Sequence, residues 1–211
     1  MKKRRVLAAF FGVLAAAGAA VTLTLGLTAR DREMVVLKED TRIMVCAQDF
    51  LDDFCSLNLA GASEKMLGEP ALTVDTDQTG AAKILWDRYW GGLEGTLEGE
   101  PYAQGSFLAV NARITYPDMA EIIRRTGELT QTLLAQKTAE ALSVAEVYDA
   151  QGGYRQDVLD EVLVQAARTA CAQTTAVCEK NVTLKLVYDG ENWKIVSGKE
   201  LRDLLSGTLE G

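Results

Sequence analysis

An uncharged run near the start of the chain constrains its fold more than any other feature. Residues 6–29 (VLAAFFGVLAAAGAAVTLTLGLTA) contain no Asp, Glu, Lys or Arg. As an α-helix, a segment of this length would be about 36 Å long, enough to cross a hydrocarbon core of about 30 Å. Because lipid offers the backbone no hydrogen-bond partners, such a segment must form a helix there. Residues 6–29 therefore predict a transmembrane helix that acts as a signal anchor.

The charges on either side of this run predict its orientation. Four basic residues lie within residues 1–5, whereas the opposite flank, residues 30–33, carries balanced charges. Basic flanks stay in the cytoplasm, so we expect a cytoplasmic tail at residues 1–5 and a single pass through the cell membrane. A stem at residues 30–38 and one extracellular domain at residues 39–211 would follow. A signal peptide cleaved after Ala20 is the alternative, and it also exports the domain.

Composition limits the classes of partner and of catalytic site that this domain can have. The chain has 22 basic and 30 acidic residues, and without the four basic residues of the tail the remainder carries a net charge of −12. An acidic surface repels nucleic acid and anionic headgroups. The chain has no His, which excludes Ser-His-Asp and Cys-His catalysis and zinc sites that need imidazole. We expect no nucleic-acid partner, no cofactor and no metal ion.

The four cysteines allow two disulfides outside a membrane, with three possible pairings. Cys46 and Cys55 belong to one predicted helix and would lie about 13 Å apart, beyond the reach of a bridge. A bridge between Cys171 and Cys178 would close a short loop after a helix and is the pairing we expect. The alternative is that the cysteines are small buried apolar residues.

Apolar residues recur every three to four positions in five segments. This spacing predicts helices over residues 41–59, 78–90, 118–148, 157–170 and 199–205. Gly61 follows the first helix and is expected to stop it. In the third, Gly127 and the polar residues 136–138 suggest a kink or two pieces. In the fourth, the residues expected to face inward are Val158, Leu159, Val162, Leu163 and Ala166.

Alternation of apolar and polar residues predicts the strands. The segments are residues 105–116 with a weaker hairpin partner at 93–100, and residues 181–188 joined to 191–197 by a two-residue turn at Asp189-Gly190. The side chains expected to face inward are Leu108, Val110, Ala112, Ile114, Val182, Leu184 and Leu186. Strands and helices do not alternate regularly, so we expect an α+β domain with an antiparallel sheet packed against helices.

Two motifs resemble those of a known family. The strand ending ITYPD at residues 114–118 and the hairpin VTLKLVYDGENWKIV at 182–196, closed by KELRDLLSG at 199–207, are similar to exported NTF2-like domains of Gram-positive bacteria. Many of these are families of unknown function behind a membrane helix. The resemblance implies a curved antiparallel sheet wrapped around helices to form a cone with a pocket. The long helical segment after Pro117 would be an insertion relative to the simplest members.

Aromatic residues gather within a short stretch of the sequence. Trp86, Tyr89, Trp90 and Tyr102 are candidates for a ligand-binding wall in the pocket that the resemblance implies. The alternative is that they fill the core between helix and sheet, as aromatic side chains commonly do. We take these four residues as the predicted ligand-binding set.

One acidic stretch imitates two known motifs. Asp75, Asp77, Thr79 and Gly80 match the start of a calcium-binding loop, but position 12, where a bidentate Glu is needed, is Trp86. The same residues imitate the nucleophile motif of haloacid-dehalogenase-type phosphatases, which requires a parallel α/β scaffold that this chain lacks. A weak surface calcium site remains an alternative, and we expect instead a polar turn that caps the following helix.

These observations favour a non-enzymatic, membrane-anchored extracytoplasmic module. It would bind a protein partner, a cell-envelope component or a small ligand. The alternative is an isomerase or dehydratase, which would need a buried, unpaired carboxylate within hydrogen-bond reach of a Tyr at the pocket floor. The predicted inward faces are apolar, which argues against the enzyme; Asn111 and Arg113 would matter if the opposite face lined the pocket. A purely structural role with self-association is a third hypothesis.

Overall fold

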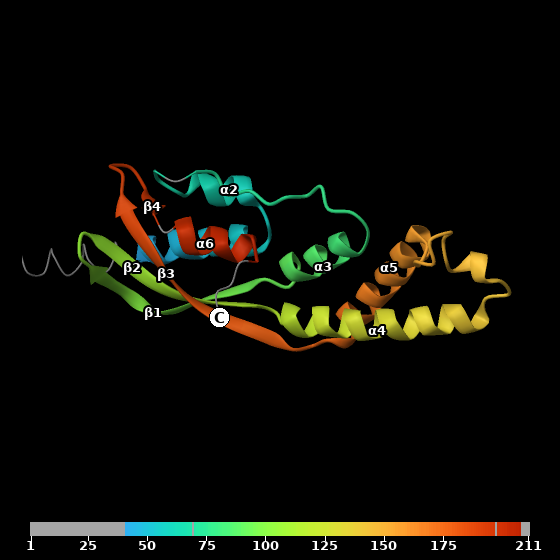
Figure 1. Cartoon of the computed structure of the whole chain (residues 1–211). Coiled ribbons are helices and arrows are strands. Elements are labelled where there is room, and N and C mark those ends of the chain that lie inside the picture. The colour runs from blue at the N-terminus through green and yellow to red at the C-terminus, as the bar shows by residue number, and fades with distance from the viewer. Residues whose placement is uncertain (1–40, 69, 197, 208–211) are drawn as a thin grey trace, which may run out of the picture. The chain divides into compact units, whose positions relative to one another are not determined.

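The structure is a computed structural model that describes residues 41–68, 70–196 and 198–207 (Figure 1). The chain divides into two units, residues 1–44 and 45–211, and of the first unit only the beginning of a helix is described. The predicted tail, transmembrane run and stem lie outside the described residues. No helix within the described ranges is long and apolar enough to cross a bilayer.

A single antiparallel sheet organises the second unit. Its strands are β1 (Glu94–Gln104), β2 (Phe107–Pro117), β3 (Val177–Tyr188) and β4 (Trp193–Ile195). They lie in the order β1-β2-β3-β4, and every neighbouring pair is antiparallel. This confirms an α+β fold with an antiparallel sheet. The strand predicted at residues 93–100 is present as β1 and extends further than predicted, to Gln104.

The predicted inward positions occupy one face of this sheet. Val110, Ala112, Ile114, Leu184 and Leu186 are completely buried, Val182 is nearly so, and Leu108 is half-buried. Successive side chains of a strand point to opposite faces, so the alternation in sequence located the covered face correctly.

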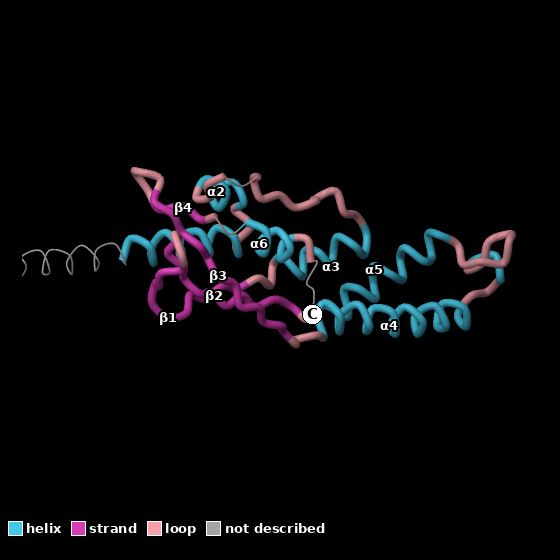
Figure 2. Tube along the Cα trace, turned by 60° about the vertical axis from the view of Figure 1, so that its left-hand side comes forward, coloured by secondary structure: helices cyan, strands magenta, loops and turns pink. Residues whose placement is uncertain are grey.

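In the first described helix, residues 41–55, the part that belongs to the second unit, residues 45–55, helps to cover that face. Its Cys46 thiol donates a hydrogen bond to the carbonyl of Trp193 on β4, with 3.2 Å between sulfur and oxygen. Leu51 lies directly against Gly95 of β1. The helix therefore crosses the sheet from β4 to β1, and α6 (Gly198–Leu205) lies on the same side (Figures 1 and 2). Phe50, Phe54, Leu201 and Leu204 are fully buried in this layer.

A helical excursion separates the neighbouring strands β2 and β3. It consists of α4 (Met119–Glu140), the short 3-10 helix η1 (Val144–Glu146) and α5 (Gln156–Gln173). The two long helices lie side by side and extend beyond the sheet (Figures 1 and 2). At their junction Val147, Val158 and Val162 form a small buried cluster of their own. The remaining helices are α2 (Leu59–Glu64) and α3 (Gly80–Trp90), and α3 packs against α5.

The first predicted helix is wrong at its end. The helix stops at residue 55, and Leu57 turns the chain with a positive φ of 60°. Asn58 then caps α2 by accepting a hydrogen bond from the amide of Gly61. Gly61 is therefore inside a helix and does not stop one. A Cβ at position 61 would lie 2.5 Å from the Asn58 side-chain nitrogen, so only glycine fits there unless that side chain moves.

Three further expectations need correction. The predicted helical segment 118–148 divides into two pieces, α4 and η1, but the break follows Glu140, and α4 runs through Gly127 and residues 136–138. The predicted inward residues Val158, Val162 and Ala166 of α5 are buried, but Leu163 is 36% exposed, and the helix buries Ala167 and Ala170 in addition. The terminal hairpin pairs Tyr188 with Trp193 and so has a four-residue loop, in which the Asp189 carboxylate accepts the amides of Glu191 and Asn192.

Candidate functional site

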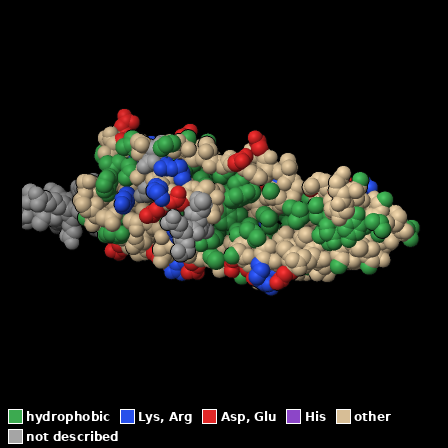
Figure 3. Space-filling view, in the orientation of Figure 1, with side chains coloured by type: hydrophobic (Ala, Val, Ile, Leu, Met, Phe, Trp, Pro, Cys, Tyr) green, Lys and Arg blue, Asp and Glu red, His purple; other side chains and the backbone are tan. Residues whose placement is uncertain are grey.

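A groove of about 960 Å³ opens where α3 faces the ends of β2 and β3. The first turns of α4 and the residues just after α6 complete its walls. The apolar lining includes Leu85, Trp86, Tyr89, Tyr116, Met119 and Ile123. Figure 3 shows apolar side chains gathered on this part of the surface, over α3 and the beginning of α4. Ile123 is 57% exposed, so apolar surface remains open to solvent here.

Helix α3 supplies one wall through simple periodicity. Ala82, Leu85, Trp86 and Tyr89 stand at helical spacings of three and four and all line the groove. The Trp86 ring packs edge-on against Tyr89, with 5.8 Å between ring centres. Tyr89 in turn meets Tyr116 of β2 at 6.0 Å. The aromatic rings therefore form a continuous surface from helix to sheet.

Two hydrogen bonds fix this aromatic wall to the end of α6. The Tyr89 hydroxyl donates to the Leu204 carbonyl at 2.6 Å, and the Trp90 indole nitrogen donates to the Leu205 carbonyl at 3.2 Å. These carbonyls belong to the last turn of α6, where a helix has no internal donors. Burial raises the pKa of Tyr89, so the phenol stays a neutral donor. The wall is thus held in place before any ligand arrives.

The sheet supplies the floor of the groove. Tyr116 pairs with Cys178, and Ile114 pairs with Lys180, across β2 and β3. Tyr116, Cys178 and Lys180 continue the buried face of the sheet to its end, where they are only partly buried and line the groove. Burial raises the pKa of both Tyr116 and Cys178. The floor therefore presents an uncharged phenol and an uncharged thiol.

The charged lining residues differ in what they already bind. Asp118 caps α4, because its carboxylate accepts the Glu121 amide at 3.0 Å. Glu179 alternates away from the floor and lies 4.0 Å from Arg113 on the opposite face. Lys180 is half-buried on the floor side. Neither carboxylate is buried or hydrogen-bonded to a tyrosine within the part of the chain that the structure describes.

The structure separates the four aromatic residues predicted as one set. Trp86 and Tyr89 line the groove. Trp90 is buried behind them, stacked on Trp86 at 5.1 Å between ring centres. Tyr102 lies on the opposite face of the sheet, where its hydroxyl is 3.0 Å from the side-chain oxygen of Asn111. The reason is strand register: Tyr102 pairs with Ala109, which alternates away from the covered face.

The sequence reasoning missed Tyr116, Met119, Ile123 and Lys180. Three of these lie around Pro117-Asp118, where a strand ends and a helix begins. That junction was visible in the sequence, and a strand whose apolar face runs directly into a helix start indicates an exposed end of the sheet. Arg113, expected to matter if the opposite face lined a pocket, is ion-paired with Glu98 on that opposite face.

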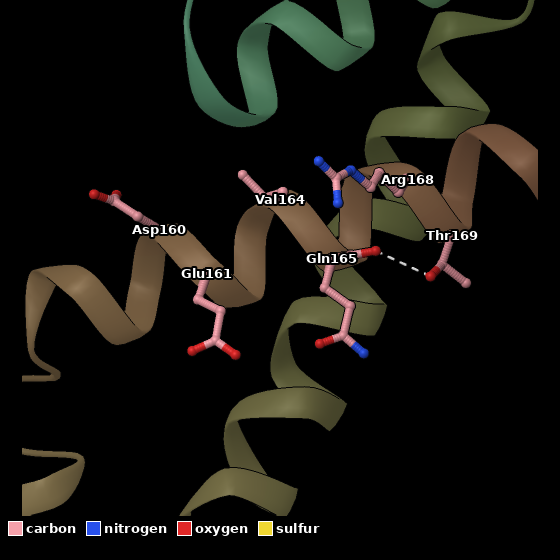
Figure 4. A pocket seen from close by; sticks show the side chains of 6 residues that line it. All are labelled: Asp160, Glu161, Val164, Gln165, Arg168 and Thr169. Atoms are coloured by element: carbon pink, nitrogen blue, oxygen red, sulfur yellow. Dashed lines mark hydrogen bonds between the residues drawn. The ribbon is translucent and has the colours of Figure 1, made fainter.

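A second depression, of about 640 Å³, runs along α5. Its six lining residues all belong to this one helix. Figure 4 shows Asp160, Val164 and Arg168 on one side of α5, while Glu161, Gln165 and Thr169 lie on the other. The polar groups diverge instead of meeting at a common point, so this surface does not form a binding site.

The remaining sequence candidates form local structure. Asp75 accepts hydrogen bonds from the Asp77 amide and the Gln78 side chain, which makes the expected polar turn before α3. The turn does not cap this helix as predicted, because the N-cap residue Thr79 makes no side-chain capping hydrogen bond. No group of three potential metal ligands occurs among residues 41–68, 70–196 and 198–207. All four cysteines, including Cys171 and Cys178, are free thiols in this structure.

Comparisons with protein-family models, with curated proteins and with solved structures found no match to this chain.

Proposed function

We propose that this protein is a non-enzymatic, membrane-anchored module that binds an amphiphilic ligand of the cell envelope. The observation that carries the proposal is the aromatic groove between α3, the ends of β2 and β3, and α4. Its volume of about 960 Å³ lies in the range of small-molecule sites, which span roughly 300 to 1,000 Å³. Its lining is mainly apolar with few polar groups, the composition expected where apolar contact supplies affinity and polar groups supply orientation.

The fixed wall of the groove and the apolar surface at its edge support a role in binding. Tyr89 and Trp90 hold α3 to the end of α6 through side-chain hydrogen bonds, so the wall needs little ordering when a ligand binds. A preformed site avoids part of the entropic cost of association. Ile123 leaves apolar surface exposed at the edge of the groove, and covering this surface would favour binding.

The alternative isomerase or dehydratase finds little support in the same lining. Such an enzyme needs a carboxylate whose pKa is raised by burial beside a hydrogen-bond donor. Asp118 is engaged as the cap of α4, and Glu179 lies beside Arg113. Tyr89 already donates its hydroxyl hydrogen to Leu204 and so is not available as an oxyanion donor.

The cellular setting of the proposal comes from the sequence. The uncharged run at residues 6–29 would anchor the chain, with the groove-bearing domain outside the cell. The resemblance of residues 114–118 and 182–196 to exported NTF2-like domains is consistent with this placement. In that reading the groove corresponds to the pocket of the cone, and α4 and η1 form the helical insertion.

Photo-crosslinking tests the proposal on the full chain. The protein is reconstituted in lipid nanodiscs, irradiated with dodecanol that carries a mid-chain diazirine, and digested with trypsin. Labels should concentrate in the groove peptides at residues 84–88 and 114–124, and excess unmodified dodecanol should compete. Labelling spread evenly over exposed peptides, or not reduced by the competitor, would contradict a specific site.

A matched pair of variants tests the location. Ile123→Gln places a polar group in the groove wall, and we expect several-fold less labelling because apolar contact area is lost. Leu142→Gln makes the same change of surface character at a residue that is 95% exposed and does not line the groove. Labelling of Leu142→Gln should equal that of the unmodified protein.

A further inference from the structure

Among the described residues that line the groove, Lys180 is the one cation. Lys180 is half-buried on the same face of β3 as the buried Val182 and Leu184. Across the described residues, it forms none of the ion pairs found in the structure. A half-buried lysine without an ion-pair partner is a feature that an anionic ligand can satisfy.

The two carboxylates near Lys180 do not fill this role. Asp118 accepts the amide of Glu121 and completes the first turn of α4. Glu179 directly precedes Lys180 on β3, so its side chain points to the opposite face, where Arg113 lies 4.0 Å away. Among the described lining residues, the charged group without a hydrogen bond or ion pair is therefore the ammonium of Lys180, although the chain as a whole is acidic.

The start of α4 adds to this local potential. Met119 and Ala120 form its first turn and line the groove. The N-terminal end of a helix carries partial positive charge on its free amides. Asp118 offsets part of this effect, so Lys180 remains the main attraction for an anion.

We propose that the ligand is a single-chain fatty acid whose carboxylate pairs with Lys180. This inference rests on the proposed function and specifies its ligand class. The alkyl chain would lie against Trp86, Tyr89 and Ile123, which form the apolar wall. An apolar chain in the groove would shield Lys180 from water, and a shielded charge is stable only with an opposite charge beside it. A cationic amphiphile would place like charges together, and a neutral one would leave the ammonium group unpaired.

The experiment compares two diazirine probes on the full chain in nanodiscs, dodecanoic acid and dodecanol, at equal measured concentration in the bilayer. At neutral pH we expect the acid to label the groove peptides at residues 84–88 and 114–124 roughly fivefold more than the alcohol, as fits a partly shielded charge pair. In Lys180→Gln the ratio of labelling by the acid to labelling by the alcohol should fall to about one. A diazirine-bearing phosphatidylglycerol, which has two chains, should label these peptides less than the acid.

Lys199→Gln is the matched control. Lys199 lies on α6, is 84% exposed and does not line the groove, so the preference for the acid should persist. Equal labelling by acid and alcohol, an unchanged preference in Lys180→Gln, or stronger labelling by phosphatidylglycerol would overturn the fatty-acid assignment alone. If neither single-chain probe labels the groove peptides specifically, the proposed function fails as well.

Discussion

The Tyr89 hydroxyl donates a hydrogen bond of 2.6 Å to the backbone carbonyl of Leu204, 115 residues further along the chain. This carbonyl lies in the last turn of α6, where a helix leaves its carbonyl groups without internal donors. Tyr89 is 1% exposed, so water does not replace the phenol as a donor. One side chain thus closes the end of a helix and holds an aromatic wall of the groove.

Removing this donor should destabilise the protein. Tyr89→Phe removes one of two donors to the Leu204 carbonyl, which also accepts the Gly207 amide at 3.2 Å, and we expect the free energy of unfolding to fall by about 0.5–1.5 kcal/mol. Urea denaturation of the full chain, followed by tryptophan fluorescence, measures the change. The control Tyr102→Phe removes a hydroxyl from a side chain that is 38% exposed, and should cost less than about 0.5 kcal/mol. Equal losses in the two variants would contradict a special role for the Tyr89 hydrogen bond.

Sequence alternation predicted the covered face of the sheet but not the full length of its strands. Val182, Leu184 and Leu186 alternate and are buried, so the strand was evident from residue 181. The strand begins earlier, at Val177. Lys180 lies on the same face as Val182 but interrupts the apolar pattern, because it faces the groove and not the core. The charged residue at this apolar position was the signal in the sequence that could have located the groove.

Long-range pairing and local turns were the parts that sequence did not reveal. Tyr102 is close to Trp86 in sequence, yet the register of β1 on β2 places it on the opposite face. That register depends on an irregularity between Glu98 and Tyr102, which no residue pattern specified. The break after residue 55 depends on a positive φ at Leu57, a conformation that residues with a Cβ rarely adopt.

Two glycines should respond in opposite directions to the same substitution. At Gly95 a Cβ would lie 2.5 Å from Leu51 Cγ, and Leu51 is fully buried, so Gly95→Ala should cost about 1–3 kcal/mol through overpacking. At Gly127, inside α4, a Cβ would meet nothing within 4 Å. Gly127→Ala should therefore stabilise the helix by about 0.5–1 kcal/mol. Urea denaturation shows whether the free energy of unfolding falls or rises in each variant. A destabilised Gly127→Ala would contradict a continuous α4.

The thiol of Cys55 should make stability depend on alkaline pH. Burial, followed by the nearby charges of Asp52 and Glu94, raises the pKa of Cys55 from 9.0 to about 12. In the unfolded chain the thiol ionises near its ordinary pKa, while in the folded protein it keeps its proton. The folded state then binds more protons, so the free energy of unfolding falls as the pH rises from 9 toward 12. Below pH 9 the contribution is complete.

Replacing this thiol tests the effect, because Cys55→Ala removes the titrating group. Its unfolding free energy should fall less steeply between pH 9 and 11 than that of the unmodified chain, with a constant offset at lower pH from the lost packing. Iodoacetamide offers an independent readout, since it reacts with thiolates. At pH 8 iodoacetamide should alkylate Cys55 much more slowly in the folded protein than in the urea-unfolded chain, as measured by mass spectrometry of tryptic peptides. Parallel pH profiles of variant and parent, together with equal alkylation rates, would show that Cys55 ionises normally in the folded protein.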